Sequence, residues 1–185
     1  MIKNQEITPV NYLALVAEFF YLAGAFSRSS QWLLIFLMAA NIFGGTHGYL
    51  TGNLQTAIDH GSSFFYNLLY IKINLNGRTL KELLPKIIGD YIDTLILPGK
   101  ILIMLIYFSD LRDILIIIST IFVFLIPRQT LIYKEKFLCG SASLFWGIYY
   151  FLGYFNLEFA IQVIVASTYY ISAWLSFKKQ KEARK

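Results

Sequence analysis

The distribution of lysine and arginine along the chain is the feature that most constrains its fold. Seven apolar stretches can be marked in the sequence, and the cations collect in alternate gaps between them. Of 16 Lys and Arg residues, 13 lie in these gaps and in the C-terminal tail, whereas Lys3 and Arg112 lie in the other gaps and Lys100 lies inside a stretch. Cytoplasmic loops of membrane proteins carry such an excess of cations. The pattern therefore predicts an all-α integral membrane fold of seven transmembrane helices, with the N-terminus outside and the C-terminus inside.

The composition supports this interpretation. Of the 185 residues, 57% are hydrophobic and only 15% are charged, whereas soluble domains average about 25% charged residues. Seven helices of roughly 20 residues leave no room for a separate soluble domain. We expect the lipid bilayer to be the main partner and predict no nucleic-acid partner, because no basic stripe is interleaved with exposed aromatic residues. The single cysteine, Cys139, excludes an intrachain disulfide.

Six of the predicted spans have simple boundaries, and the fourth does not. The six run approximately over residues 11–26, 31–50, 54–73, 113–133, 137–154 and 157–177. The stretch from Leu80 to Phe108 is too long for one span, so we expect an amphipathic, interface-lying start near Leu80 followed by a span that ends at Phe108. Pro98-Gly99 is expected to kink or break that helix.

An internal repeat relates the two halves of the chain at an offset of 103 residues. Asn53-Leu54 and Ala57-Ile58 lie over an identical pattern that begins at Asn156, and His47 lies over Tyr150. The repeat predicts one three-helix unit over residues 1–76, an interfacial segment plus linker helix over 77–110, and a second three-helix unit over 111–185. Because the linker is a single span, both units should run in the same direction. Parallel repeats of this kind hold their substrate site near the midplane, where the halves meet.

Three segments carry a family resemblance over nearly the whole chain. They are residues 47–52 (HGYLTG), 145–153 (FWGIYYFLG) and 174–179 (WLSFKK). With these segments the chain resembles the bacterial inner-membrane YgjV family, which is similar to the MtN3-like group of SWEET, PQ-loop and PnuC transporters. The resemblance implies a multi-pass protein of the bacterial inner membrane, built as three spans, a linker span and three spans. Where the family places a histidine in both repeats, this chain has His47 and Tyr150.

Several polar and aromatic residues fall within the predicted spans and are candidates for a substrate site. An ionisable group inside a span costs roughly 2.5–3.5 kcal/mol on insertion, so each one needs a reason. Glu18 and Asp59 are candidates for proton coupling, or are carboxyl groups that only hydrogen-bond to a neighbouring helix. The candidate substrate-binding residues are Asn41, His47, Asn67, Trp146, Tyr150 and Gln162. The alternatives are helix-joining hydrogen bonds for the amides, a structural role for the histidine and interfacial anchoring for the aromatics.

Other polar residues in the spans receive no functional role. His60 follows Asp59 directly, and adjacent residues on a helix point about 100° apart, so the two are not expected to face one site well. Two histidines and scattered acids lack the spacing of a metal site, and we predict neither metal nor cofactor. Lys100 is expected to extend to the membrane surface or to pair with Asp93.

Two functional hypotheses remain open. No nucleophile elbow, zinc-binding motif or phosphate loop is present, so an enzyme is not predicted. The first hypothesis is a transporter or facilitator for a small polar solute, with its site between the repeats. The second is a non-transporting receptor or assembly partner that uses the stretch Leu80–Gly99 and the basic tail Lys178–Lys185. A polar central cavity would favour the first, and a dry, packed centre the second. Whether the chain forms a homo-oligomer stays open.

Overall fold

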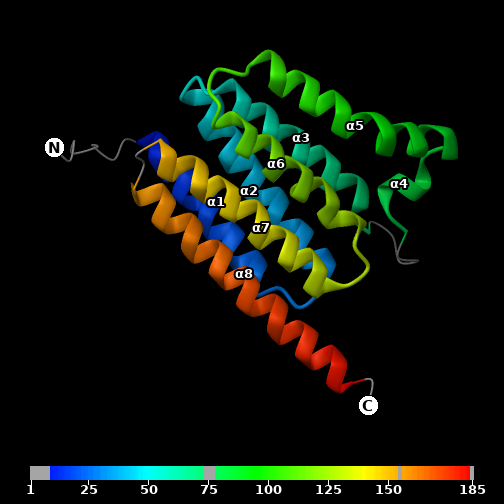
Figure 1. Cartoon of the computed structure of the whole chain (residues 1–185). Helices are drawn as coiled ribbons and strands as arrows, with labels where there is room; N and C mark the ends of the chain where they lie inside the picture. The colour runs from blue at the N-terminus through cyan, green and yellow to red at the C-terminus, as the bar shows by residue number, and fades with distance from the viewer. Residues whose placement is uncertain (1–8, 73–77, 154–155, 184–185) are drawn as a thin grey trace.

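The computed structural model describes residues 9–72, 78–153 and 156–183 (Figure 1). Their regular structure is helical apart from one isolated bridge between Lys72 and Thr79, which confirms the prediction of an all-helical chain. The elements are α1 (Pro9–Ala25), α2 (Ser30–Leu50), α3 (Leu54–Tyr70), α4 (Leu80–Leu83), α5 (Lys86–Ile106), α6 (Asp113–Leu125), the 3-10 turn η1 (Ile126–Arg128), α7 (Ile132–Leu152) and α8 (Asn156–Glu182).

Six helices form a closed ring. Contacts join α1 to α2, α2 to α3, α3 to α6, α6 to α7, α7 to α8, and α8 back to α1. Helix α5 lies outside this ring and packs on α3 and α6. In Figure 1, α1, α3, α6 and α8 run in one direction and α2, α5 and α7 run in the other. The triplets α1–α3 and α6–α8 therefore have the same direction, and exchanging one for the other preserves the pattern of contacts between helices.

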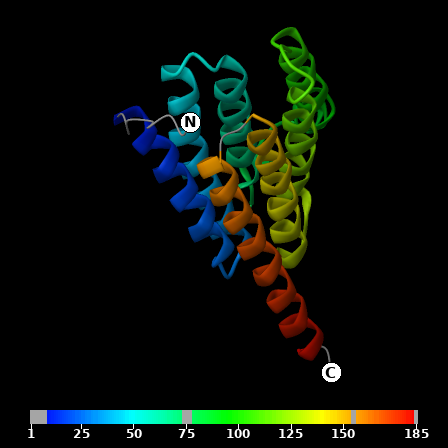
Figure 2. The ribbon, with the colours of Figure 1, turned by 60° about the vertical axis from the view of Figure 1, so that its left-hand side comes forward.

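The connections that carry most of the cations lie at one end of the bundle. The α1–α2, α3–α4 and α6–α7 connections and the C-terminal end of α8 all lie at this end, which we call the basic end. The α2–α3 and α5–α6 connections lie at the opposite end. Figure 2 shows the last turns of α8 projecting beyond the other helices at the basic end. The alternation of cations in the sequence thus corresponds to two physical ends of the fold.

Several features differ from those predicted, including the bounds of the helices on either side of Pro127. The fifth predicted span, 113–133, is shortened because Pro127 has no N–H to continue the ladder, and α6 gives way to η1 at Ile126. Helix α7 begins at Ile132 rather than near Phe137, because its polar first turns are buried by the rest of the fold. Helix α5 is not broken at Pro98 but continues through it to Ile106.

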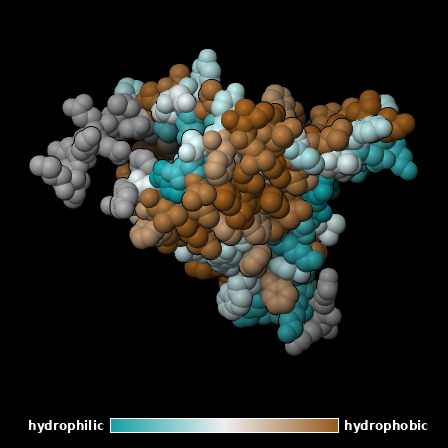
Figure 3. All heavy atoms as spheres, turned by 45° about the horizontal axis from the view of Figure 1, so that its top comes forward, coloured by the Kyte–Doolittle hydropathy of each residue, from teal (hydrophilic) through white to brown (hydrophobic). Residues whose placement is uncertain are grey.

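The outer surface of the bundle is rich in apolar side chains. Large hydrophobic residues such as Phe19, Phe65, Ile106 and Trp174 are each at least 60% exposed. Figure 3 shows apolar residues gathered over the middle of one face, with hydrophilic residues toward its edges. Soluble monomers rarely expose a continuous apolar patch of this kind. Within the described residues, α2 and the segment Leu157–Glu182 of α8 are long and apolar enough to cross a membrane.

Candidate functional site

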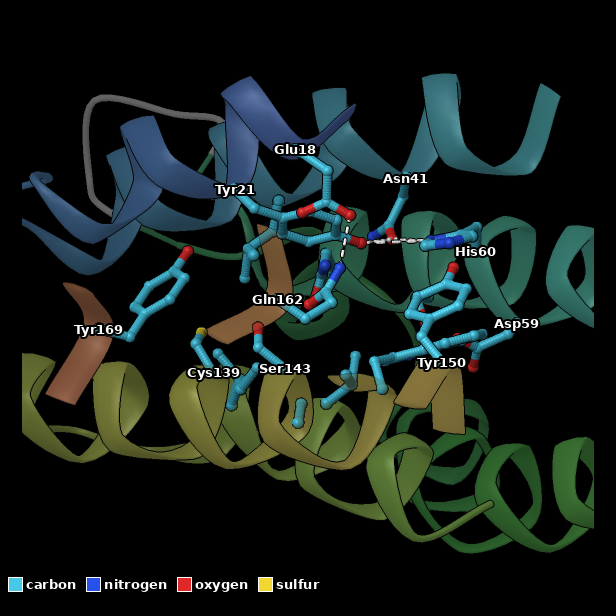
Figure 4. A pocket seen from close by; sticks show the side chains of 17 residues that line it. Glu18, Tyr21, Asn41, Asp59, His60, Cys139, Ser143, Tyr150, Gln162 and Tyr169 are labelled. Atoms are coloured by element: carbon cyan, nitrogen blue, oxygen red, sulfur yellow. Dashed lines mark hydrogen bonds between the residues drawn. The ribbon is translucent and has the colours of Figure 1, made fainter. Parts of the chain in front are cut away.

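A small polar cavity lies at the centre of the six-helix ring (Figure 4). Its volume is about 60 Å³, and every helix of the ring contributes to its wall, whereas α5 contributes no lining residue. The polar and aromatic residues that line it are Glu18, Tyr21, Asn41, Asp59, His60, Ser63, Asn67, Ser143, Trp146, Tyr150, Gln162 and Tyr169. The chain therefore buries hydrogen-bonding groups at its centre while it exposes apolar ones, the reverse of a soluble protein.

One wall of the cavity is a hydrogen-bonded triad from three helices. The Tyr21 hydroxyl on α1 donates to Asn41 Oδ1 on α2 at 3.2 Å. His60 Nδ1 on α3 lies 3.0 Å from the same oxygen and 3.2 Å from the Tyr21 hydroxyl. Whether Nδ1 of His60 donates or accepts in these contacts depends on the tautomer of the imidazole ring. The triad fixes the relative positions of α1, α2 and α3 around the cavity.

A carboxyl group next to this triad, on the same face of α1 as Tyr21, is only half satisfied. Gln162 Nε2 on α8 donates to Glu18 Oε1 on α1 at 2.6 Å, across the seam between the two triplets. Glu18 Oε2 is buried and has no hydrogen-bond partner, and neither has either polar side-chain atom of Asn67 on α3. Buried polar atoms are nearly always paired, so unpaired atoms in one small cavity need an explanation. They supply an acceptor, an amide donor and an amide acceptor to whatever occupies the cavity.

A buried ion pair closes the side of the cavity next to α5. Lys100 Nζ lies 2.7 Å from Asp59 Oδ1, and both side chains are at most 6% exposed. The same ammonium donates to the Asp59 carbonyl and to Ser63 Oγ, while Thr120 Oγ1 donates to Asp59 Oδ1 at 2.8 Å. The prediction that Lys100 extends to the surface is therefore wrong. Asp93, its other predicted partner, has a side chain outside the described ones.

Aromatic rings border the cavity toward the end opposite the basic end. The imidazole of His60 stacks on Trp146, with centroids 6.2 Å apart and planes at 10°. Trp146 in turn contacts Tyr149 and Tyr150 on the last turns of α7, with centroids 5.6 and 5.7 Å away. Toward the basic end, an apolar cluster that includes Leu33, Ile126 and Tyr169 fills the bundle. The cavity is thus bounded by rings at one end and by packed hydrophobic side chains at the other.

The structure brings together most of the predicted site residues. Asn41, Asn67, Trp146, Tyr150 and Gln162 all line the cavity. So do Glu18 and Asp59, the two residues predicted to couple protons. The binding of a substrate by any of them stays a prediction.

His47 is the exception, and it does not line the cavity. The buried face of α2 follows Leu37, Asn41, Gly44 and Gly48 at helical spacing, and His47 lies one step off this stripe. The histidine that lines the cavity is instead His60, which was not predicted because adjacent helical residues were not expected to face one site. Asp59 and His60 both line the cavity from different sides of α3. Asp59 lies toward α5 and α6, and His60 lies toward α1 and α2.

The internal repeat points to the position next to His60 but not to His60 itself. A Cβ atom built on Gly44 would lie 2.8 Å from His60 Nε2, and one built on Gly147 would lie 3.3 Å from Gln162 Cβ. Gly44 and Gly147 are related by the 103-residue offset, so each triplet sets a glycine on its second helix against a cavity-lining residue on its third. Carrying Gln162 back by the same offset leads to Asp59, one residue from His60.

Within the described part of the chain, no group of three or more His, Cys, Asp and Glu side chains is arranged to hold a metal ion. No family model matches the sequence, and no curated protein or solved structure matches it either. The YgjV resemblance and its implied activity therefore stay predictions, and any proposal of function rests on the cavity itself.

Proposed function

We propose that this chain is a multi-pass membrane protein that transports or facilitates the passage of a small polar solute through its central cavity. The observation that carries the proposal is a central cavity lined by polar side chains, with unpaired atoms of Glu18 and Asn67, inside a bundle whose outer surface is rich in apolar residues. A protein that acts only as an assembly partner has no need for such groups at its centre, since each buried unpaired polar atom costs about 1–3 kcal/mol.

The proposed topology is seven spans, α1 to α3 and α5 to α8, with the basic end in the cytoplasm. Two described cations do not fit the alternation, and both are in ion pairs. Lys100 is paired with Asp59, and Arg112 lies 2.6 Å from Asp110 Oδ2 in the α5–α6 turn. The Arg112 guanidinium, by donating to that carboxylate, holds the pKa of Asp110 below its usual range. Neither cation is therefore left as a free charge on the proposed outer side or in the bilayer.

The cavity is too small to hold a metabolite as it stands. A volume of about 60 Å³ holds a few water molecules, each of which needs roughly 10–15 Å³. Sites for larger ligands have volumes of about 300–1,000 Å³. A metabolite would therefore require the triplets to separate, and the seams available for that are the α1–α8 and α3–α6 contacts. Rocking of two parallel repeats about a fixed central site is an established way for transporters to work.

The cavity chemistry indicates a polar solute that donates hydrogen bonds. Asp59 is neutralised by Lys100, which leaves Glu18 as the carboxyl group with a free oxygen. Glu18 lies on the seam between the triplets through its bond to Gln162, so a change in its protonation would alter the contact between the two halves. This geometry favours Glu18 over Asp59 as the proton-coupling residue.

Uptake into proteoliposomes with a broad panel of small polar metabolites tests the proposal. We expect at least one solute to accumulate, and we expect Asn67→Leu and Trp146→Ala to reduce its uptake by roughly tenfold or more through loss of cavity contacts. Glu18→Gln should abolish stimulation by an imposed proton gradient and also slow solute counterflow, because it replaces the carboxylate that offers its free oxygen to the solute. The matched control is Trp32→Ala, because Trp32 is 57% exposed on α2 and does not line the cavity.

The opposite result would favour the second hypothesis. If no solute binds or moves, and if the Asn67 and Trp146 variants leave the phenotype of the producing cell intact, the cavity has no transport role. The receptor or assembly-partner function would then be preferred, with the α4–α5 region and the basic tail as its working surfaces.

A further inference from the structure

A second pocket lies at the basic end, separate from the central cavity. It is formed where the α1–α2 connection meets the first turn of α7 and the last turns of α8, and its volume is about 550 Å³. Its lining residues are Phe26, Ser27, Arg28, Ile132, Lys136, Ser172, Leu175, Ser176, Lys179, Gln180 and Ala183. Three of them are cations and none is acidic, so the pocket has a net positive lining.

The most informative of these cations is Lys136, which is buried at 3% exposure. Its ammonium donates to Ser172 Oγ at 2.8 Å and to Ser176 Oγ at 3.5 Å, and no carboxylate among the described residues forms a salt bridge with it. Glu135, the preceding residue, is also buried but does not line the pocket. An ammonium group has three donors, so Lys136 retains one beyond its two serine partners. A buried charge without a salt bridge is costly, and Glu135 acts on Lys136 only from a distance, so an anion in the pocket would stabilise the ammonium further.

A second polar group in the pocket is also unpaired. Ser27 is 7% exposed, and its Oγ is buried without a hydrogen-bond partner. Arg28 follows it directly at the rim, and Lys179 projects from α8 toward the same space. Guanidinium, ammonium and hydroxyl donors around one pocket are the groups that bind phosphate oxygens.

We infer that this pocket binds a phosphate-class oxyanion, held by Arg28, Lys136, Lys179 and the Ser27 hydroxyl. The same phosphate group occurs in two sources, the head group of an anionic phospholipid and a free phosphate ion. The exposed apolar residues Phe26 and Leu175 at the pocket and the attraction of anionic lipids to basic clusters at the cytoplasmic surface favour the lipid. The inference does not depend on transport through the central cavity.

The full chain, reconstituted in phosphatidylcholine nanodiscs with a minor share of phosphatidylglycerol, tests it. We expect native mass spectrometry to show retained phosphatidylglycerol on the wild type, reduced about tenfold by Arg28→Gln or Lys179→Gln, each of which removes a charged hydrogen-bond donor. Ser27→Ala removes the buried hydroxyl without adding bulk and should weaken retention in the same direction. In a second arm, calorimetric titration of the detergent-purified protein with inorganic phosphate identifies the free anion as the source if the same variants weaken that binding instead.

The matched control is Lys178→Gln. Lys178 precedes Lys179 and carries the same charge, but it lies over the Trp174 ring at 5.8 Å and does not line the pocket. Lys178→Gln should therefore retain the lipid or the phosphate like the wild type. If Lys178→Gln weakens binding as much as Lys179→Gln does, general surface charge explains the effect and the proposed site is excluded. Failure of both phosphatidylglycerol and phosphate to bind overturns it as well.

Discussion

At the scale of single residues, the polar groups within the bundle divide into those held by partners and those left free. Asp59 belongs to the first kind, because an ammonium and a hydroxyl both contact its Oδ1. One carboxylate oxygen of Glu18 has no hydrogen-bond partner, and neither polar side-chain atom of Asn67 has one, so these groups are of the second kind. Paired groups contribute to the assembly of the fold, whereas free groups are available to a ligand. Stability measurements should therefore separate the first kind from the second.

Breaking the Asp59–Lys100 pair should be strongly destabilising. Asp59→Asn or Lys100→Met leaves the other charge buried and unpaired, which lowers the free energy of unfolding by about 3–5 kcal/mol. The double variant Asp59→Asn with Lys100→Met removes both charges and should recover much of this loss. Thermal unfolding of the detergent-purified protein, compared across the four forms, measures the coupling.

The control for this pair is Arg112→Gln. Its partner Asp110 is exposed in the α5–α6 turn, and solvent screens such pairs, so the Tm should stay close to that of the wild type. Wild-type Tm values for both Asp59→Asn and Lys100→Met would contradict the buried pair.

At the scale of helices, the close approach of α2 to α3 positions the first half of the site. Gly44, Gly45 and Gly48 lie on the face of α2 that contacts α3. A Cβ atom built on Gly48 would lie 2.8 Å from the backbone nitrogen of Ala57, which cannot move without moving its helix. Small residues allow helices in membranes to pack at such short distances. The short distance between α2 and α3 therefore determines how far the side chains of Asp59 and His60 extend into the central cavity.

Gly48→Ala should therefore separate α2 from α3. We expect a loss of about 1–3 kcal/mol in the free energy of unfolding, as for overpacking in a tight core. Gly61→Ala on α3 is the matched control, because a Cβ atom there would meet no heavy atom within 4 Å. That control should be neutral or stabilising by up to about 1 kcal/mol, from the better helix propensity of alanine. Equal effects of the two substitutions on Tm would show that the packing at Gly48 is looser than described.

At the scale of the whole molecule, the fold is a ring of two similar triplets with a basic end, an opposite end and a central cavity. The first triplet ends at Tyr70 and the second begins at Asp113, and α5 returns the chain between them so that both run in the same direction. The two seams, α1 with α8 and α3 with α6, correspond to each other under the exchange of triplets. The proposed internal repeat, with a pseudo-twofold axis between the triplets, predicts this correspondence.

The proposed orientation predicts the accessibility of single cysteines. Leu111→Cys lies in the α5–α6 turn, 78% exposed, and should react with a membrane-impermeant maleimide on intact cells. Thr130→Cys lies in the exposed α6–α7 connection at the basic end and should react only after the membrane is opened. Native Cys139 is buried and provides a silent background. Labelling of both positions from the same side would exclude the seven-span arrangement.

The sequence by itself determined the helical class and the approximate bounds of several helices, since α1, α2 and α3 lie within about three residues of the predicted spans. The length of an apolar stretch and the turn residues that bound it are local properties, so they can be recognised in the sequence alone. It also indicated which polar residues would lie inside, because an ionisable or amide group in an apolar helix avoids lipid.

The tertiary structure alone decided how those residues are paired. It placed His60 rather than His47 in the cavity, joined Lys100 to Asp59 and set Gln162 against Glu18. The last two contacts link helices that are distant in sequence, so they depend on which helix faces meet when the whole bundle assembles. Helical periodicity gives the buried face of a single helix, but the neighbour of that face is fixed only by the packing of the ring and of α5 against it.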